Sequence, residues 1–323
     1  AWGYAVMRTF IPEKGLSVII PVYNSENILP SLTERLENSL RALGQNFEVI
    51  LVVDGSPDGS WQQVLSLQEK YAWVRGIHLM RNYGQHNALL RGIRAANFDT
   101  IITMDDDLQH PPEEIHKLLA ELEKDYDVVY GFPAKDTHDA WRNFSSRFTK
   151  RMLNIALGVA GIEKSGAFRA FRTKLREGFV DYNSSFVSVD VLLTWGTTRF
   201  GYIPVDHAPR AEGHSNYTFR KLITHTFNLM TGFSTLPLQL ASLLGFGLTL
   251  FGFSIFLYVI IRYFFQGSPV PGFPFLASII SIFSGAQLFA IGIFGEYLSR
   301  MYFRLMGKPQ SLVREEIGFS TEK

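Results

Sequence analysis

Cysteine is absent from this chain of 323 residues. A disulfide framework and thiolate chemistry are therefore excluded, which fits a cytoplasmic compartment. The formal net charge is only +1 at pH 7, and this near-balance argues against a broad nucleic-acid-binding surface. Residues Ala1–Gly15 lack the long apolar core of a signal peptide, and we expect them to form an N-terminal extension.

Two common nucleotide-binding signatures are also missing. No Gly-x-Gly-x-x-Gly follows the first apolar run and there is no Walker loop, so dinucleotide and P-loop sites are disfavoured. Apolar residues, in contrast, are abundant: they make up 46% of the chain, with 27 Phe, and the excess lies toward the C-terminus. The length suffices for one large domain with an appendage, or for two domains.

Short β-branched apolar runs alternate with helix-like segments in the first hundred residues. The predicted strands cover residues 16–22, 47–53, 74–79 and 100–104, and the predicted helices 28–43, 61–71 and 81–96. Further strands are expected at 127–130, 166–172 and 200–205, and a helix at 186–193. Repeated strand–helix units predict an α/β fold with a doubly wound, mainly parallel sheet and helices on both faces.

Three consecutive carboxylates, Asp105 to Asp107, follow the fourth predicted strand. Like charges packed this tightly repel, so a folded chain tolerates them best around a cation. The run predicts a divalent metal that holds a diphosphate; an acidic surface turn is the alternative. If the extended geometry persists, alternation places Asp105 and Asp107 on one side and Asp106 on the other.

Other polar residues follow the first three predicted strands. Tyr23 and Asn24 follow the first, Asp54 the second, and Asn82 and Gly84 the third. In doubly wound sheets, ligands lie beyond the carboxyl ends of the strands. The common placement of these residues therefore predicts one binding site that includes the acidic run.

Two apolar segments, 240–265 and 275–294, are long enough to span a bilayer, and Arg262 is the only Asp, Glu, Lys or Arg between residues 222 and 295. Two long buried core helices are the alternative. Arginine and lysine flank the pair on its outer sides, so the positive-inside rule places both flanks in the cytoplasm. Residues 218–237 are expected to form interfacial amphipathic helices.

The combination resembles a known family, the inverting family 2 glycosyltransferases of the GT-A fold, in their polyprenyl-phosphate group. That group includes dolichyl-phosphate mannose synthase and the undecaprenyl-phosphate transferases of the GtrB and ArnC types. The QxxRW motif of the processive polysaccharide synthases is absent. The motifs that carry the resemblance are Ile20–Asn24 (IPVYN), Val53–Ser56 (VDGS), Arg81–His86 (RNYGQH), Asp105–Gln109 (DDDLQ), Phe168-Arg169, Gly213–Tyr217 (GHSNY) and Gly295–Leu298 (GEYL).

The resemblance implies roles for individual residues. Asp105, Asp107 and Gln109 resemble ligands of Mg²⁺ or Mn²⁺ and the diphosphate, and Asp105, Asp107 and Arg169 form the expected catalytic set. The residues expected to bind the donor nucleotide are Pro21, Tyr23, Asn24, Asp54, Asn82, Gly84, Gln85 and Asp106. Those expected at the acceptor phosphate or the diphosphate are Arg147, Arg151, Arg210 and Ser215, with a solvated charge facing anionic lipid as the alternative for each arginine. Within the acidic run, we expect the metal at Asp107 and Gln109, Asp105 beside the donor, and the least harm from loss of Asp106.

Four positions depart from the family pattern. Val53 stands where many members have Asp, Ser25 stands where many have Glu, Asn216 replaces a common Lys, and Ala167 replaces an Asp sometimes proposed as the base. A phosphate monoester has a second pKa near 6, so the acceptor is already largely a dianion at neutral pH. Our hypothesis is that no dedicated base stands at position 167. Asp107, Asp190 and Glu163 are the fallback candidates.

The implied function is inverting transfer of one sugar from a UDP-linked donor to undecaprenyl phosphate at the inner membrane, for modification of a cell-envelope glycan. A GDP-mannose-dependent activity like that of dolichyl-phosphate mannose synthase and a non-catalytic membrane scaffold are the alternatives. The expected partners are the nucleotide-sugar, the lipid phosphate, the bilayer and a second copy of the chain, with no nucleic acid. The expected divisions are a cytoplasmic catalytic domain (16–217), the interfacial segment (218–237), a transmembrane hairpin (238–298) and a cytoplasmic tail (299–323).

Overall fold

The structure is a computed structural model that describes residues 12–134, 164–184, 187–208, 231, 235–266 and 272–319. The chain divides into two compact units. Unit 1 comprises Ala1–Asn216 and Pro309–Lys323, and unit 2 comprises Tyr217–Lys308. Residues 135–163, residues 209–217 and most of the expected interfacial segment lie outside the described residues.

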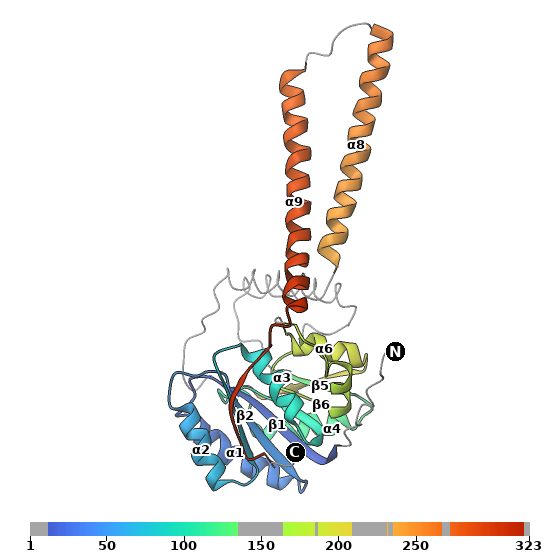
Figure 1. Cartoon of the computed structure of the whole chain (residues 1–323). Coiled ribbons are helices and arrows are strands. Elements are labelled where there is room, and N and C mark those ends of the chain that lie inside the picture. Colours follow the sequence, from blue (N-terminus) through green and yellow to red (C-terminus); the bar gives the residue numbers. More distant parts are fainter. Residues whose placement is uncertain are drawn as a thin grey trace, which may run out of the picture. The chain divides into compact units, whose positions relative to one another are not determined.

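Unit 1 alternates strands and helices as the sequence predicts (Figure 1). In chain order its elements are β1 (Glu13–Val22), α1 (Leu29–Ala42), β2 (Phe47–Val53), α2 (Ser60–Lys70), β3 (Val74–Leu79), α3 (Gln85–Ala95), β4 (Phe98–Thr103), the 3-10 helix η1 (Pro112–Glu114), α4 (Ile115–Leu122), β5 (Val128–Pro133), β6 (Arg169–Arg172), the 3-10 helix η3 (Thr173–Gly178), α6 (Val189–Gly196), β7 (Phe200–Val205) and β8 (Val313–Ile317).

The described strands form one mainly parallel sheet in the order β7-β5-β6-β4-β1-β2-β3-β8. β1 pairs in parallel with β2 and β4, β2 with β3, and β5 with β7. β6 runs antiparallel between β4 and β5, and β8 runs antiparallel along β3. The predicted doubly wound sheet is confirmed, and the antiparallel edge strand β8, from the C-terminal tail, is an addition to it.

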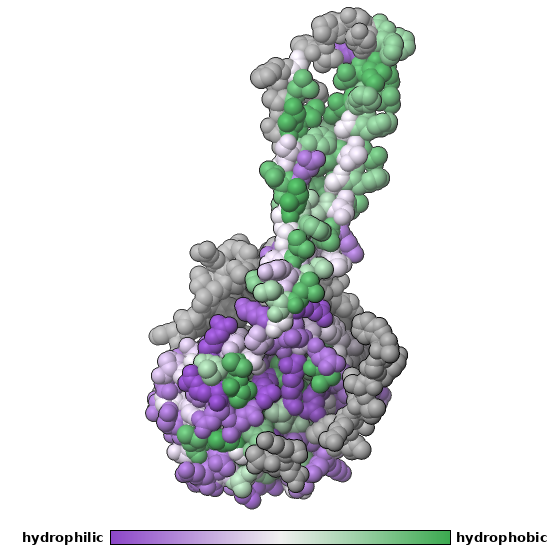
Figure 2. Space-filling model, in the orientation of Figure 1, coloured by the Kyte–Doolittle hydropathy of each residue, from purple (hydrophilic) through white to green (hydrophobic). Residues whose placement is uncertain are grey.

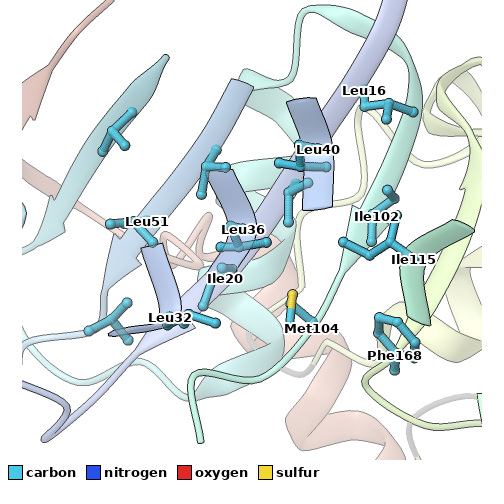
Figure 3. Packing of buried hydrophobic residues seen from close by; sticks show 14 of the residues in the cluster. Leu16, Ile20, Leu32, Leu36, Leu40, Leu51, Ile102, Met104, Ile115 and Phe168 are labelled. Carbon is cyan, nitrogen blue, oxygen red and sulfur yellow. The ribbon is translucent and has the colours of Figure 1, made fainter. Parts of the chain in front are cut away.

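The two faces of the sheet are covered by different helices. Leu32, Leu36 and Leu40 of α1 pack against Ile20 and Leu51 on one face (Figure 3). That cluster also takes in residues of α2 and α4. Because side chains alternate along a strand, the neighbours of these strand residues point to the opposite face.

α3 covers the opposite face, and a glycine brings it close. A Cβ atom added at Gly92 would lie 2.4 Å from Ile19 Cγ2 and 3.1 Å from Val52 Cγ2. Any larger residue would push α3 away from the sheet. The N-terminus of α3, which borders the cleft described below, is therefore positioned by packing one and a half to two turns further along the helix.

Unit 2 contains α8 (Leu236–Gln266) and α9 (Phe273–Leu305), which contact each other. Both are long and apolar enough to cross a membrane, over Pro237–Arg262 and Ile282–Leu305. Most of their large apolar side chains are exposed, and Figure 2 shows hydrophobic residues along both helices. A core helix of a soluble protein would bury such side chains, so the exposure favours two spanning helices over the core-helix alternative.

Candidate functional site

A cleft of about 280 Å³ lies at the carboxyl ends of the central strands. It is lined by Pro21, Val22, Tyr23, Asp54, Asn82, Gly84, Gln85, Asp105, Asp106 and Asp107. All of the residues predicted to bind the donor nucleotide except Asn24 are in this lining, together with Asp105 and Asp107 from the acidic run. Parallel strands bring these residues together because their carboxyl ends share one edge of the sheet.

Asp54, at the end of β2, is buried and holds the neighbouring turn. Its Oδ1 accepts a hydrogen bond from the Tyr83 N–H and its Oδ2 one from the Gly84 N–H, both at 2.7 Å. Burial raises the pKa of Asp54, and the two backbone N–H groups oppose that rise. Gly84 has φ 95°, a conformation that glycine adopts without strain. Asp54 therefore fixes the turn that carries Asn82 and Gly84 into the cleft.

Gly55 allows that turn to approach the end of β2. Its φ is 59°, and an added Cβ would lie 2.2 Å from the carbonyl carbon of Arg81 and 2.4 Å from the Asn82 nitrogen. Backbone atoms cannot move aside as a flexible side chain can. The Asp54-Gly55 pair thus explains why the second and third strand ends meet.

Asp106 joins the ends of β1 and β4. Its Oδ2 accepts hydrogen bonds from the Tyr23 N–H at 3.2 Å and from the Ser25 hydroxyl. Burial raises the pKa of Asp106, and these two donors oppose that rise. These contacts argue against the expectation that loss of Asp106 does the least harm. The alternation argument does not apply, since β4 ends at Thr103 and Leu108 has φ 59°.

Asp105 and Asp107 accept hydrogen bonds from two different residues. The Gln85 side-chain amide donates to Asp105 Oδ1 at 2.6 Å, and the Gln109 N–H donates to Asp107 Oδ1 at 3.1 Å. In the described part of the chain, no three His, Cys, Asp or Glu side chains converge as a metal site would require. The oxygen donors present still fit Mg²⁺, which is commonly held by one or two carboxylates together with substrate phosphates.

The exit of β1 is tied to the exit of β2 by a second set of contacts. The Asn24 N–H donates to the Ser56 hydroxyl at 2.8 Å, and the Ser25 N–H donates to the Ser60 hydroxyl at 3.0 Å. The Glu26 carboxylate accepts from the Gly59 N–H at 2.9 Å. Ser25, one of the departures from the family pattern, therefore holds both Asp106 and the neighbouring loop.

Arg169 lies beneath the cleft rather than in it. Its side chain is only 1% exposed, its Nε donates to the Thr103 hydroxyl at 2.9 Å, and Nη1 donates to Asp190 Oδ1. The Tyr130 hydroxyl donates to the same Asp190 oxygen at 3.0 Å. A guanidinium engaged in this way is absent from the cleft lining, where Asp105 and Asp107 of the expected catalytic set lie. It acts instead on Thr103, two residues before Asp105.

Position 167 belongs to the same network. The Thr103 hydroxyl donates to the Ala167 carbonyl oxygen at 2.6 Å, so the backbone at this position is fixed without an acidic side chain. Asp190, one fallback base, already accepts hydrogen bonds from Arg169 and Tyr130.

Several predicted site residues lie outside the described residues. They are the four predicted to bind phosphate, Arg147, Arg151, Arg210 and Ser215, together with Glu163 and Asn216.

A pair of histidines beside the acidic run was not predicted. His110 stacks on Phe168 with ring centroids 5.2 Å apart and meets the edge of His207 at 5.0 Å. Burial, followed by the neighbouring His207, lowers the pKa of His110 to about 4. The Ala208 N–H also donates to the Gln109 carbonyl oxygen at 2.9 Å. The exit of β7 is therefore fastened to the acidic run.

A larger cavity, about 370 Å³, lies at the opposite ends of the strands. Its lining includes Glu48 and Arg75, which form a buried ion pair with each other. The Glu48 carboxylate also accepts from the Ser17 hydroxyl at 2.7 Å and from the Asn97 N–H at 2.7 Å. These charges neutralise one another, so the smaller cleft remains the candidate functional site.

Comparison with known proteins decides the family. Residues 17–179 match the model of glycosyl transferase family 2. The chain belongs to glycosyl transferase family 2. It is 36% identical over 305 residues to the undecaprenyl-phosphate 4-deoxy-4-formamido-L-arabinose transferases of Pseudomonas paraeruginosa and Pseudomonas aeruginosa, covering 94% of this chain and 90% of each relative. The chain is therefore a glycosyltransferase.

Solved structures confirm the fold of this family 2 glycosyltransferase. Glucosyl-3-phosphoglycerate synthase from Mycobacterium tuberculosis, in a complex with Mn²⁺, UDP-glucose and phosphoglyceric acid, matches with a TM-score of 0.51 at 16% sequence identity. The match covers 68% of this chain and 78% of that one. The UDP complex of the same synthase matches with a TM-score of 0.50 over the same shares. At this identity the likeness shows the GT-A fold alone.

Proposed function

We propose that this glycosyltransferase moves one sugar from a UDP-linked donor to undecaprenyl phosphate, with inversion at the anomeric carbon. The observation that carries the proposal is that one chain contains both of the following features. The cleft gathers the acidic run and the polar strand ends, and unit 2 supplies two helices suited to a bilayer. The long match to relatives named for undecaprenyl-phosphate transfer supports the lipid acceptor.

The roles of the cleft residues follow from their positions. Asp107 and Asp105, with Gln109, would hold Mg²⁺ or Mn²⁺, which would neutralise the departing nucleoside diphosphate. Tyr23, Asn82 and Gly84 would line the nucleoside, on backbone that Asp54 and Asp106 hold in place. Because the loops are already ordered, donor binding does not have to offset the entropic cost of ordering them, and the donor is positioned more tightly.

The transfer itself forms a bond between an acceptor phosphate oxygen and the anomeric carbon, and breaks the bond from that carbon to the donor diphosphate. Attack from the face opposite the leaving diphosphate inverts the anomeric configuration. The acceptor phosphate is largely a dianion at neutral pH, so no proton has to be removed first. Ala167 fits this reaction because its backbone position is fixed without a carboxylate. Both chain termini would lie in the cytoplasm, with the donor.

Calorimetry of nucleotide binding provides the first test. The full-length protein is expected to bind UDP more tightly with Mn²⁺ than without it, and Asp107→Asn is expected to abolish the difference. Glu113→Gln is the matched control, because Glu113 pairs with Arg35 on the surface. Tighter binding of GDP than of UDP would favour the GDP-mannose alternative, and binding of neither nucleotide would favour a scaffold.

Transfer to undecaprenyl phosphate is then measured with a panel of nucleotide sugars. A product whose anomeric configuration is opposite to that of the donor is expected. Retention of configuration, or transfer only to water-soluble acceptors, would overturn the proposed reaction.

A further inference from the structure

After unit 2, the chain re-enters unit 1 at Pro309. Unit 1 exposes apolar side chains on both sides of this re-entry point. On one side, Trp195 is 53% exposed and Val180 is 40% exposed. The Trp195 ring meets the ring of Tyr182 edge-on at 5.4 Å, and Gly178 and Gly196 bring the two segments into contact.

On the other side, Leu312 is 52% exposed and Met80 is 44% exposed. The Met80 N–H donates to the Leu312 carbonyl oxygen at 2.8 Å, so the two residues lie side by side where β3 ends and β8 begins. We call the four exposed residues Met80, Val180, Trp195 and Leu312 the apolar rim.

Gln310 fixes the rim from within. It is only 6% exposed, its Nε2 donates to the Ser184 carbonyl oxygen at 3.0 Å, and its Oε1 accepts from Arg94 Nη1 at 2.8 Å. Arg94 Nη2 in turn donates to the carbonyl oxygens of Val180 at 3.1 Å and Tyr182 at 2.6 Å. The returning chain and the segment that carries Val180 are thus held by one pair of buried polar side chains.

The length of the chain limits how far the rim can lie from a membrane. Gln310 follows Leu305, the last residue of α9, by five positions, and Leu312 follows it by seven. Fully extended, these stretches reach about 18 Å and about 25 Å. A bilayer carries a headgroup layer of roughly 6 Å on each side of its hydrocarbon core. If α9 spans the bilayer up to residue 298, as the proposed function requires, its last seven residues add about 10 Å, so Leu312 lies within about 35 Å of the hydrocarbon core.

The composition of the rim suits the lipid headgroup layer. Tryptophan is enriched at membrane–water interfaces, where its ring is partly apolar and its N–H stays hydrated. Arg314 is exposed beside Met80, whose carbonyl oxygen it contacts at 3.2 Å, and Lys308 lies just before Gln310 in the chain. Such cations attract anionic lipid.

We propose that the apolar rim is a docking surface for the lipid headgroup layer, by which unit 1 rests on the bilayer. Docking of this kind orients the catalytic unit relative to a lipid acceptor, whose phosphate lies at the level of the headgroups. The proposal rests on the membrane location in the proposed function, and it adds a surface outside the cleft.

The absence of cysteine makes a direct test possible. Val180→Cys, Trp195→Cys and Leu312→Cys are each spin-labelled in the full-length protein, which is reconstituted in vesicles of phosphatidylethanolamine with anionic phosphatidylglycerol. Accessibility to oxygen and to a water-soluble nickel chelate is measured by power saturation. The rim labels are expected to show more oxygen and less nickel contact than Glu69→Cys, an exposed position near the end of α2.

Phe256→Cys, an exposed position on α8, separates failure of this proposal from failure of the proposed function. If the label at position 256 contacts lipid while the rim labels behave like that at position 69, the docking surface is wrong and the membrane location stands. If the label at position 256 is also in water, the membrane location fails first. Rim labels shielded from both reagents and dipole-coupled between copies would overturn the proposal in favour of a protein interface.

Kinetics provide an independent readout. Trp195→Glu is expected to raise KM for undecaprenyl phosphate several-fold in vesicles while leaving UDP binding unchanged, because Trp195 lies outside the cleft lining. Trp195→Phe is the conservative control and should retain most of the affinity. An unchanged KM in Trp195→Glu would count against docking.

Discussion

Asp106 shows how a single carboxylate can hold the backbone of a neighbouring strand end. Its Oδ2 receives the Tyr23 N–H and the Ser25 hydroxyl, which both belong to the exit of β1. Asp106→Ala leaves both donors without their acceptor. We expect a loss of about 1–3 kcal/mol in the free energy of unfolding. We also expect kcat/KM to fall about 100-fold, since Tyr23 moves relative to Asp107.

Denaturant melts and steady-state kinetics check this prediction, and Asp106→Asn is its matched control. The asparagine amide oxygen can still accept from both donors, so this variant should keep most of the stability. If Asp106→Ala is as stable and active as the wild type, the expectation that Asp106 is dispensable would be right after all.

The sequence predicted which polar residues lie in the cleft, but not which groups they contact. Asp54 and Asp106 were predicted because they follow apolar strands, and both line the cleft. Their hydrogen-bond partners, Tyr83 and Ser25, lie 29 and 81 positions away in the chain. Pairings over such distances depend on tertiary structure, which hydrophobic periodicity does not describe. The contacts of Arg169 could not be predicted for the same reason, since its partner Asp190 comes from α6.

At the scale of elements, the loop after β2 depends on Gly55. Gly55→Ala would place a methyl group against the backbone of Arg81 and Asn82 at a positive φ. Strain of this kind costs on the order of 1–3 kcal/mol, and it displaces the turn that Asp54 holds. We expect weaker nucleotide binding by calorimetry.

Gly44→Ala is the control for Gly55→Ala. Gly44 also has a positive φ, 64°, but an added Cβ there meets nothing within 4 Å. Equal UDP affinities in the two variants would exclude the contact with Arg81 as the cause.

Strands β1 to β7 were all predicted, most of them because buried strands are continuous apolar runs bounded by turn residues. β8 was missed because its five residues, Val313–Ile317, are mostly charged and belong to an exposed edge. Edge strands are commonly charged, which hides them from a search for apolar runs. Its place in the sheet is fixed by long-range contacts: the Trp61 N–H donates to Glu315 at 3.2 Å, and Arg91 pairs with Glu316.

The β3–β8 pair should make stability depend on pH. His78 on β3 stacks on Trp61, and burial, followed by the positive charge of Arg314, lowers its pKa from the ordinary 6.5, while Glu315 raises it. The folded state then binds fewer protons than the unfolded state in the window just below pH 6.5. Stability due to neutral His78 is therefore present above that pH and is lost as the pH falls.

The measurement is thermal unfolding of wild type and His78→Phe between pH 7.5 and 5. The phenylalanine ring keeps the stacking on Trp61 but cannot take a proton. We expect the melting temperature of the wild type to fall more steeply with acid than that of the variant. Parallel curves would show that His78 does not contribute.

At the scale of the whole molecule, the catalytic unit is discontinuous in the chain. Pro309–Lys323 belongs to unit 1 although the whole of unit 2 precedes it. The tail adds β8 to the edge of the sheet, where β3 would otherwise expose unpaired N–H and C=O groups. Unit 2 and the catalytic unit are therefore joined by two connections, and Gln310 anchors the second of them.

This discontinuity predicts how the catalytic unit can be isolated. A chain that ends at residue 216 lacks β8 and leaves β3 as an open edge, so it should aggregate. A chain in which about 20 Gly and Ser residues replace 217–308 keeps β8, because such a linker spans roughly 25 Å on average. We expect the linked chain to be monomeric and to bind UDP with Mn²⁺, as measured by light scattering and calorimetry. Replacing Val313 and Ile317 by proline in the linked chain should restore aggregation, since proline disrupts strand pairing. If the chain ending at residue 216 is equally soluble and binds UDP equally well, β8 is not needed to close the sheet.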